Sequence, residues 1–119
     1  LKLYNKIDLA LDTFPYPGVT TTFEAILMGV PVLTMKGFNF NSRCGESINK
    51  NLKLFDFIAK HNEDYINKAV NFTKQKKLLN KINGNLLRDS ALMSPLFNTS
   101  KFTSDFEKKM EELYIENYK

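Results

Sequence analysis

Three consecutive threonines, Thr20, Thr21 and Thr22, are the residues whose type and spacing best suit ligand chemistry. They follow Gly18 and Val19 and precede an apolar helical pattern, so their amides should lie in a first helical turn, where no intrahelical acceptor exists. Unpaired amides and the helix dipole attract anions, and threonine hydroxyls add further donors. Gly18 lets a ligand approach the backbone closely. This segment therefore suits a bound diphosphate.

Glu24 adds a carboxylate about one helical turn further along. It stands four residues after Thr20 and three after Thr21, so the three side chains can project from neighbouring positions. A carboxylate at that distance from a diphosphate can accept hydrogen bonds from a ribose diol, which predicts a nucleotide-diphosphate site. A purely structural role stays open, because threonines also cap helices and the dipole alone favours glutamate in a first turn.

Other polar residues are weaker candidates. Asp12, at the end of a predicted strand, is expected to support the threonine loop, and Arg43 suits either loop support or contact with a phosphate. His61 is expected to be a solvated surface residue, and Cys44 lacks the basic surroundings of a catalytic thiol. The sequence has no carboxylate cluster, so we predict no metal site.

Short apolar strands and helices alternate around these residues. The run Ile7–Leu11 predicts a buried strand that breaks at the prolines after it. An apolar stripe over residues 23–30 predicts a helix, which Gly29 and Pro31 end, and Val32–Met35 predicts a second strand. A strand, helix and strand with short connections fold naturally as a parallel crossover.

The rest of the chain is predicted to be helical. The expected helices cover Ser42–Lys50, a short piece at Leu54–Ala59, Asn62–Phe72, Leu78–Leu87, and a last helix with a capping box at Ser104 and Glu107. Two strands are too few for a stable sheet, so the other strands are expected before Leu1. We therefore predict one partial domain, residues 1–119, which is the C-terminal half of a doubly wound α/β domain in a longer protein.

Composition narrows the function classes. The chain of 119 residues is 43% hydrophobic and 25% charged, which is typical of a globular domain and argues against disorder. The formal charge is +4, but the lysines are spread out and form no patch for nucleic acid, and those at 74–81 suit a solvated helix face. No apolar run reaches the roughly 18 residues of a membrane span. A single cysteine fits a reducing, cytoplasmic location.

A longer set of motifs strengthens the nucleotide hypothesis. It comprises Ile7–Tyr16, Gly18, Thr20–Thr22, Glu24–Ala25, Met28–Val32, Ser42–Ser47 and Ser94–Phe97. In order and spacing it resembles the signature of the O-GlcNAc transferase and SPINDLY-type protein O-glycosyltransferases, over nearly the whole chain. The resemblance implies a Rossmann-like domain of the GT-B type and a transferase that moves a sugar to Ser or Thr of proteins.

The resemblance also assigns roles by position. It implies that Thr20 and Thr21 bind the donor diphosphate and Glu24 its ribose, with Gly18 and Val19 contributing backbone contacts. No metal is implied. The family's catalytic base, its histidine and its acceptor groove are expected before Leu1, with helical repeats further upstream, so no catalytic residue is expected in this chain. The donor implied first is UDP-GlcNAc, and the alternative is GDP-fucose, as in SPINDLY-type O-fucosyltransferases.

Two departures from the family pattern keep another class open. Val19 replaces the usual glycine or histidine, and Pro17 replaces asparagine or alanine. Both fit a non-catalytic nucleotide-binding or interaction module, which the sequence before Leu1 would distinguish from an enzyme. A hydrolase is excluded because the chain has no nucleophile elbow or triad. Alone, the 119-residue chain is expected to show little turnover and poor solubility.

Overall fold

A central strand, β2 (Val32–Met35), organises the computed structural model, which describes residues 2–119. It pairs in parallel with β1 (Ala10–Leu11) on one side and β3 (Ile58–Ala59) on the other, giving the order β1-β2-β3. Ala10 is opposite Val32, and Thr34 is opposite Ile58. All four residues of β2 are buried, because helices cover both faces of a parallel sheet.

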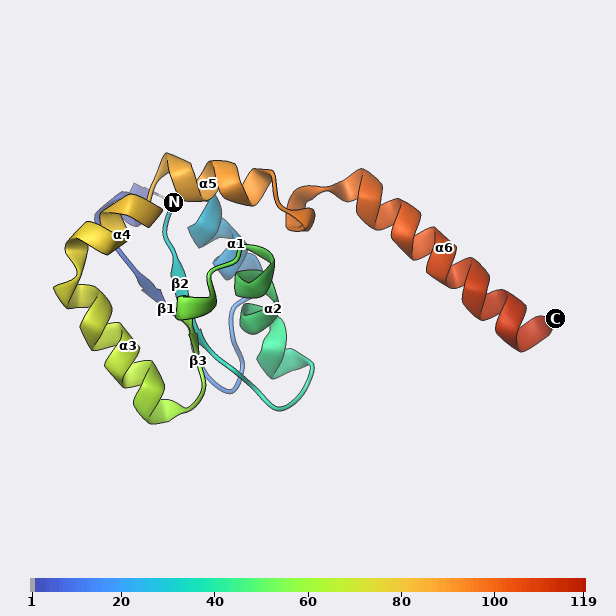
Figure 1. Cartoon of the computed structure of the whole chain (residues 1–119), viewed down its shortest axis with the longest axis horizontal. Helices are drawn as coiled ribbons and strands as arrows, with labels where there is room; N and C mark the ends of the chain where they lie inside the picture. The colour runs from blue at the N-terminus through green and yellow to red at the C-terminus, as the bar shows by residue number, and fades with distance from the viewer. Residues whose placement is uncertain (1) are drawn as a thin grey trace.

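Six α-helices and four 3₁₀ segments surround the sheet in the described part of the chain. The α-helices are α1 (Thr20–Leu27), α2 (Cys44–Asn51), α3 (Asn62–Lys74), α4 (Lys76–Ile82), α5 (Asn85–Leu92) and α6 (Thr99–Tyr118). The 3₁₀ segments are Lys2–Lys6, Asn41–Arg43, Phe55–Phe57 and Pro95–Phe97. Helices α1 and α2 lie on one side of the sheet and α3 on the other, while α6 extends away from the body (Figure 1). None of the α6 residues is buried.

The core has two parts, one on each face of the sheet. Val32 packs into the cluster with α1, α2 and α5, whereas the next residue, Leu33, packs into the cluster with α3 and α4. This alternation follows from the period of two in a strand. Phe57 and Phe72 stack in the second cluster with ring centroids 4.4 Å apart. Burial of each such side chain contributes about 1.5–3 kcal/mol.

The predicted strand–loop–helix–strand unit is confirmed, with shorter bounds. β1 covers only the last two residues of the predicted strand, and α1 ends at Leu27. Gly29, at φ 80°, ends the helix, and the Val30 amide donates to the Ala25 carbonyl at 2.8 Å. This six-to-one hydrogen bond is the Schellman arrangement, so Val30 packs beside the helix rather than inside it.

The expected helical piece at Leu54–Ala59 was wrong in its second half. Only Phe55–Phe57 form a 3₁₀ turn, and Ile58–Ala59 form the third strand. The Lys36 amide donates to the Ala59 carbonyl at 2.8 Å, so this strand exists because β2 offers it backbone partners. Two residues are too few to show any periodicity in a sequence.

Three predicted helix bounds were also wrong. The single helix over Leu78–Leu87 is two helices, because Gly84 interrupts it with φ 76°. α6 begins before Ser104, since the Asn98 side chain caps it by accepting from the Lys101 amide at 3.0 Å. Ser42 lies in a 3₁₀ turn and accepts from the amides of Phe38 and Asn39, so it does not cap α2.

Candidate functional site

The predicted site lies at the carboxyl end of β1, where the chain loops into α1. Val19 is the N-cap of α1, and no side chain caps this helix. Within the described residues, the amides of Thr20, Thr21 and Thr22 donate no hydrogen bond. Unpaired amides at a helix start attract anions, and the dipole adds to that attraction. In an open parallel sheet, ligands bind at this edge.

The three threonines differ in their surroundings. Thr20 and Thr21 are exposed, whereas Thr22 is buried and its hydroxyl donates to the Gly18 carbonyl at 3.0 Å. Glu24 is also exposed and makes no ion pair in the described part of the chain. None of the threonines caps the helix, so they do not have the capping role that the sequence left open. Thr20, Thr21 and Glu24 are free to contact a ligand.

Asp12 holds the loop that leads into α1. One carboxylate oxygen accepts hydrogen bonds from the Gly18 amide at 2.7 Å and the Thr13 amide at 3.1 Å. The other accepts from the Thr34 hydroxyl at 2.9 Å. The Asp12 backbone carbonyl accepts from the Tyr65 hydroxyl at 2.6 Å. A role of Asp12 in supporting the loop requires bonds of this kind, which tie the loop to β2 and α3.

Gly18 is needed here for space. A Cβ atom at this position would overlap the Thr21 hydroxyl and lie 3.0 Å from the Thr22 hydroxyl oxygen. Any side chain would therefore require the exposed Thr21 side chain to move from its present position. Pro17, one of the two departures from the family pattern, is buried within this loop, whereas Val19 is 42% exposed.

The sequence analysis did not single out Thr34 and Tyr65, the two residues that form hydrogen bonds to Asp12 from outside its loop. Burial of the Tyr65 hydroxyl raises its pKa, and the nearby Asp12 charge raises it further. The signal for Thr34 was present: it is a hydroxyl in an otherwise apolar strand, where an unpaired polar group is costly. Tyr65 gave no such signal, because aromatic residues are common on the inner face of a helix.

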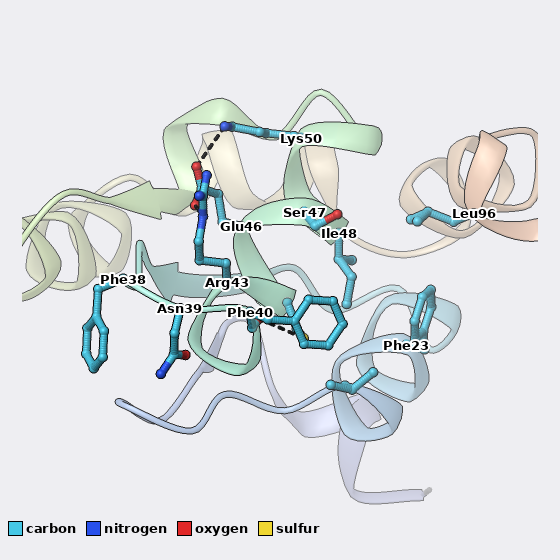
Figure 2. Close-up of a pocket in the computed structure, with 12 residues that line it drawn as sticks. Phe23, Phe38, Asn39, Phe40, Arg43, Glu46, Ser47, Ile48, Lys50 and Leu96 are labelled. Carbon is cyan, nitrogen blue, oxygen red and sulfur yellow. Dashed lines mark hydrogen bonds and ion pairs between the residues drawn. The ribbon is translucent and has the colours of Figure 1, made fainter. Parts of the chain in front are cut away.

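A hollow of about 640 Å³ lies beside the helix start, between α1 and α2. Its apolar wall includes Phe23, Phe40, Ile48 and Leu96, whose side chains gather on one side in Figure 2. Of the predicted site residues, only Val19 and Arg43 line this hollow. Gly18, Thr20, Thr21 and Glu24 do not, so the predicted residues do not share one cavity.

Arg43 forms an ion pair with the buried Glu46, which also pairs with Lys50 (Figure 2). Glu46 is 3% exposed and accepts from Arg43 Nε at 3.1 Å and Lys50 Nζ at 2.7 Å. Burial alone would raise the pKa of Glu46, but the hydrogen bonds from Lys50 and Arg43 outweigh it and lower the pKa. The terminal amino groups of Arg43 make no hydrogen bond in the described part of the chain. Arg43 thus supports α2 while keeping donors free.

The remaining candidates have structural surroundings. His61 is exposed and is the N-cap of α3, where its Nδ1 accepts from the Asp64 amide at 3.3 Å. The Cys44 thiol contacts the Phe40 carbonyl at 3.6 Å. Residues 2–119 contain no group of three or more His, Cys, Asp or Glu side chains placed to hold a metal. No helix among them has the length and apolar character that crossing a bilayer requires.

A parallel sheet with helices on both faces defines the class of Rossmann-like α/β domains. Comparison with known proteins identifies the family within that class. The profile of glycosyl transferase family 41 matches residues 4–106. The chain belongs to this family, which confirms the resemblance found in the sequence.

Individual relatives agree with the family assignment. The chain is 36% identical over 107 residues to the SPINDLY protein of Eustoma exaltatum subsp. russellianum, a probable UDP-N-acetylglucosamine–peptide N-acetylglucosaminyltransferase. It is 32% identical over 114 residues to the SPINDLY protein of Arabidopsis thaliana, which is described in the same way. These alignments cover 90% and 96% of this chain, but the chain spans only 12% of each relative.

A solved structure confirms the fold. A point mutant of the O-GlcNAc transferase from Thermobaculum terrenum superimposes on this chain with a TM-score of 0.81 at 32% identity. The match covers 92% of this chain and 21% of the transferase chain. The predicted α/β class with parallel strands, as in a GT-B-type half domain, is therefore confirmed.

Proposed function

We propose that this chain is the donor-binding part of a longer protein glycosyltransferase, which transfers GlcNAc from UDP-GlcNAc to Ser or Thr of proteins. The observation that carries the proposal is the start of α1, where three amides lack partners beside the exposed Thr20, Thr21 and Glu24. The names of the SPINDLY relatives support UDP-GlcNAc as donor and a polypeptide as acceptor.

The helix start would bind the donor diphosphate. Amides fixed by the backbone need no reorganisation when negative charge develops on the leaving diphosphate, so they stabilise that charge at little cost. The hydroxyls of Thr20 and Thr21 would add donors at the same place. Because these groups supply the charge stabilisation, we propose a reaction that requires no metal ion or other cofactor.

Glu24 would bind the nucleoside end of the donor. It stands one helical turn beyond Thr20, and its carboxylate is exposed and without an ion-pair partner in the described residues. A carboxylate in that position accepts two hydrogen bonds from the ribose hydroxyls. This contact is the same for UDP and GDP. GDP-fucose is therefore the alternative donor, and binding experiments must distinguish it from UDP-GlcNAc.

The rest of the enzyme would lie outside this chain. We propose that the catalytic base and the acceptor groove belong to other parts of the longer protein, since the chain spans only 12% of the SPINDLY relatives. We also propose a cytoplasmic location, which the single, unpaired cysteine fits.

Calorimetry with the full-length protein tests the donor site. UDP and GDP are titrated separately into wild type, Thr20→Ala/Thr21→Ala and Glu24→Ala, with Thr103→Ala/Glu107→Ala on exposed α6 as the matched control. We expect affinity for one nucleotide to fall at least about tenfold in both site variants, the loss expected for hydrogen bonds to charged groups. Unchanged affinity for both nucleotides would remove the assignment. Tighter binding of GDP than UDP would favour the fucose donor.

A further inference from the structure

Thr34 is a buried hydroxyl in the middle of an apolar strand. It is 1% exposed and lies between Leu33 and Met35 in β2. An unpaired hydroxyl in this position would be costly, whereas valine has the same shape and no such cost. The Thr34 hydroxyl donates to the second carboxylate oxygen of Asp12 at 2.9 Å. Its partner therefore explains why a polar residue stands at this place in the core.

The hydrogen bonds continue from Asp12 to the helix start. The first Asp12 oxygen accepts from the Gly18 amide at 2.7 Å, and the Gly18 carbonyl accepts from the Thr22 hydroxyl at 3.0 Å. Three consecutive bonds thus connect the central strand to the first turn of α1. Since Thr20 and Thr21 lie between Gly18 and Thr22, the positions of their amides depend on this connection.

Close packing keeps the connection in one geometry. A Cβ atom at Gly45, in the first turn of α2, would overlap the Thr34 hydroxyl and lie 2.7 Å from the second Asp12 oxygen. The Tyr65 hydroxyl holds the Asp12 backbone from the other side at 2.6 Å. The Asp12 carboxylate therefore has little space to rotate as long as both oxygens are bonded.

We propose that Thr34 is a positioning residue for donor binding, which it serves through Asp12 and Gly18 without touching the ligand. The inference rests on the proposed function, because it assumes that the start of α1 binds the diphosphate. Without the Thr34 bond, one oxygen of Asp12 loses its partner and the carboxylate can turn away from the Gly18 amide. The loop then no longer fixes the positions of the Thr20 and Thr21 amides.

The test compares Thr34→Val with Thr34→Ser in the full-length protein. Valine keeps the shape and removes the donor, and serine keeps the donor. We expect Thr34→Val to raise the dissociation constant for the preferred nucleotide, and the KM for its sugar donor, about fivefold. We expect kcat to change less than twofold, because the groups that react are untouched. Thr34→Ser should restore both constants to within about twofold of wild type.

A stability-matched control separates positioning from simple loss of stability. Ile82→Val shortens a partly buried side chain that packs against the second core cluster and takes no part in the bonds between Thr34 and Thr22, and it should lower the melting temperature without changing nucleotide affinity. If Thr34→Val lowers the melting temperature like Ile82→Val and leaves affinity unchanged, Thr34 is only structural and the inference is overturned. If Thr34→Val yields no soluble protein, Thr34→Cys replaces it, since a thiol is a weak donor. Affinity equal to that of Thr34→Ser would then overturn the inference.

Failure of the inference and failure of the proposed function give different results. If Glu24→Ala and Thr20→Ala/Thr21→Ala weaken nucleotide binding but Thr34→Val does not, the donor site holds and Thr34 has no positioning role. If none of these variants changes nucleotide affinity, the donor site itself is wrongly assigned, and Thr34 with it.

Discussion

Gly84 donates its amide to the carbonyl of Gly29 at 2.8 Å, and the two glycines join the end of α1 to the start of α5. Both have positive φ, at 76° and 80°. A Cβ atom at Gly29 would lie 2.7 Å from the Gly84 amide nitrogen, whereas a Cβ atom at Gly84 would meet nothing within 4 Å. The contact is therefore tight from one side only.

This asymmetry predicts different costs for two similar substitutions. Gly84→Ala should lower the free energy of unfolding by about 1–3 kcal/mol, the cost of a side chain at strained backbone angles. Gly29→Ala should cost more than Gly84→Ala, because it also forces α1 and α5 apart. Urea unfolding of both variants measures the difference. An equal or smaller cost for Gly29→Ala would show that the contact is looser than the structure indicates.

We predict that the fold requires the buried side-chain amide of Asn49 for its stability. It is 1% exposed, and its side-chain nitrogen donates to the carbonyls of Val32 at 2.9 Å and Phe57 at 3.1 Å. Asn49→Asp removes both donors and buries a carboxylate, so we expect a loss of about 3 kcal/mol or more in the free energy of unfolding near neutral pH. Chemical denaturation measures this loss.

The control for that variant is Asn80→Asp, an exposed position on α4. It introduces the same charge without a buried partner and should change stability by no more than about 0.5 kcal/mol. Lowering the pH should return part of the stability of Asn49→Asp, because the protonated acid can donate one of the two bonds. A stable Asn49→Asp protein near neutral pH would contradict the bridging role of Asn49.

The lowered pKa of Glu46 predicts how the free energy of unfolding depends on pH. Its folded-state pKa is lowered from the ordinary value of 4.5, because the hydrogen bonds from Lys50 and Arg43 outweigh the effect of burial. A lowered carboxyl pKa stabilises the fold above the unfolded-state value, and this stability is lost as the pH falls through the folded-state pKa. We therefore expect Glu46→Gln to be less stable than wild type near neutral pH by about 1–2 kcal/mol. The difference should shrink as the pH falls below 4.5.

Glu112 supplies the control for the pH experiment. It pairs with Lys109 at 3.1 Å on α6, and both side chains are largely exposed, at 45% and 60%. Exposed pairs contribute little, so Glu112→Gln should follow the wild-type curve. Thermal unfolding of wild type, Glu46→Gln and Glu112→Gln over a pH series measures these differences. A constant gap between wild type and Glu46→Gln at every pH would rule out the ion pairs as the source of the stability.

Much of the supporting fold could be predicted because its signals are local. Val32–Met35 is a short run that is apolar except for Thr34, between a proline and a glycine loop, and the structure places it at the centre of the sheet. The threonine segment was predicted to open a helix, and α1 begins at Thr20. Ile58–Ala59 could not be predicted, since a two-residue strand is created by its pairing with β2 rather than by its own residues.

The sequence by itself determined the family, the class of fold and which residues open the helix at the proposed site. The class of fold and the helix start depend on residue type and local backbone preference, which act over one or two turns of chain, whereas the family follows from the order and spacing of motifs along nearly the whole chain. Only the tertiary structure decided that Thr34 and Tyr65 hold Asp12 and that Gly29 touches Gly84. These contacts join residues 22, 53 and 55 positions apart, and no local pattern specifies which polar groups meet once a core excludes water.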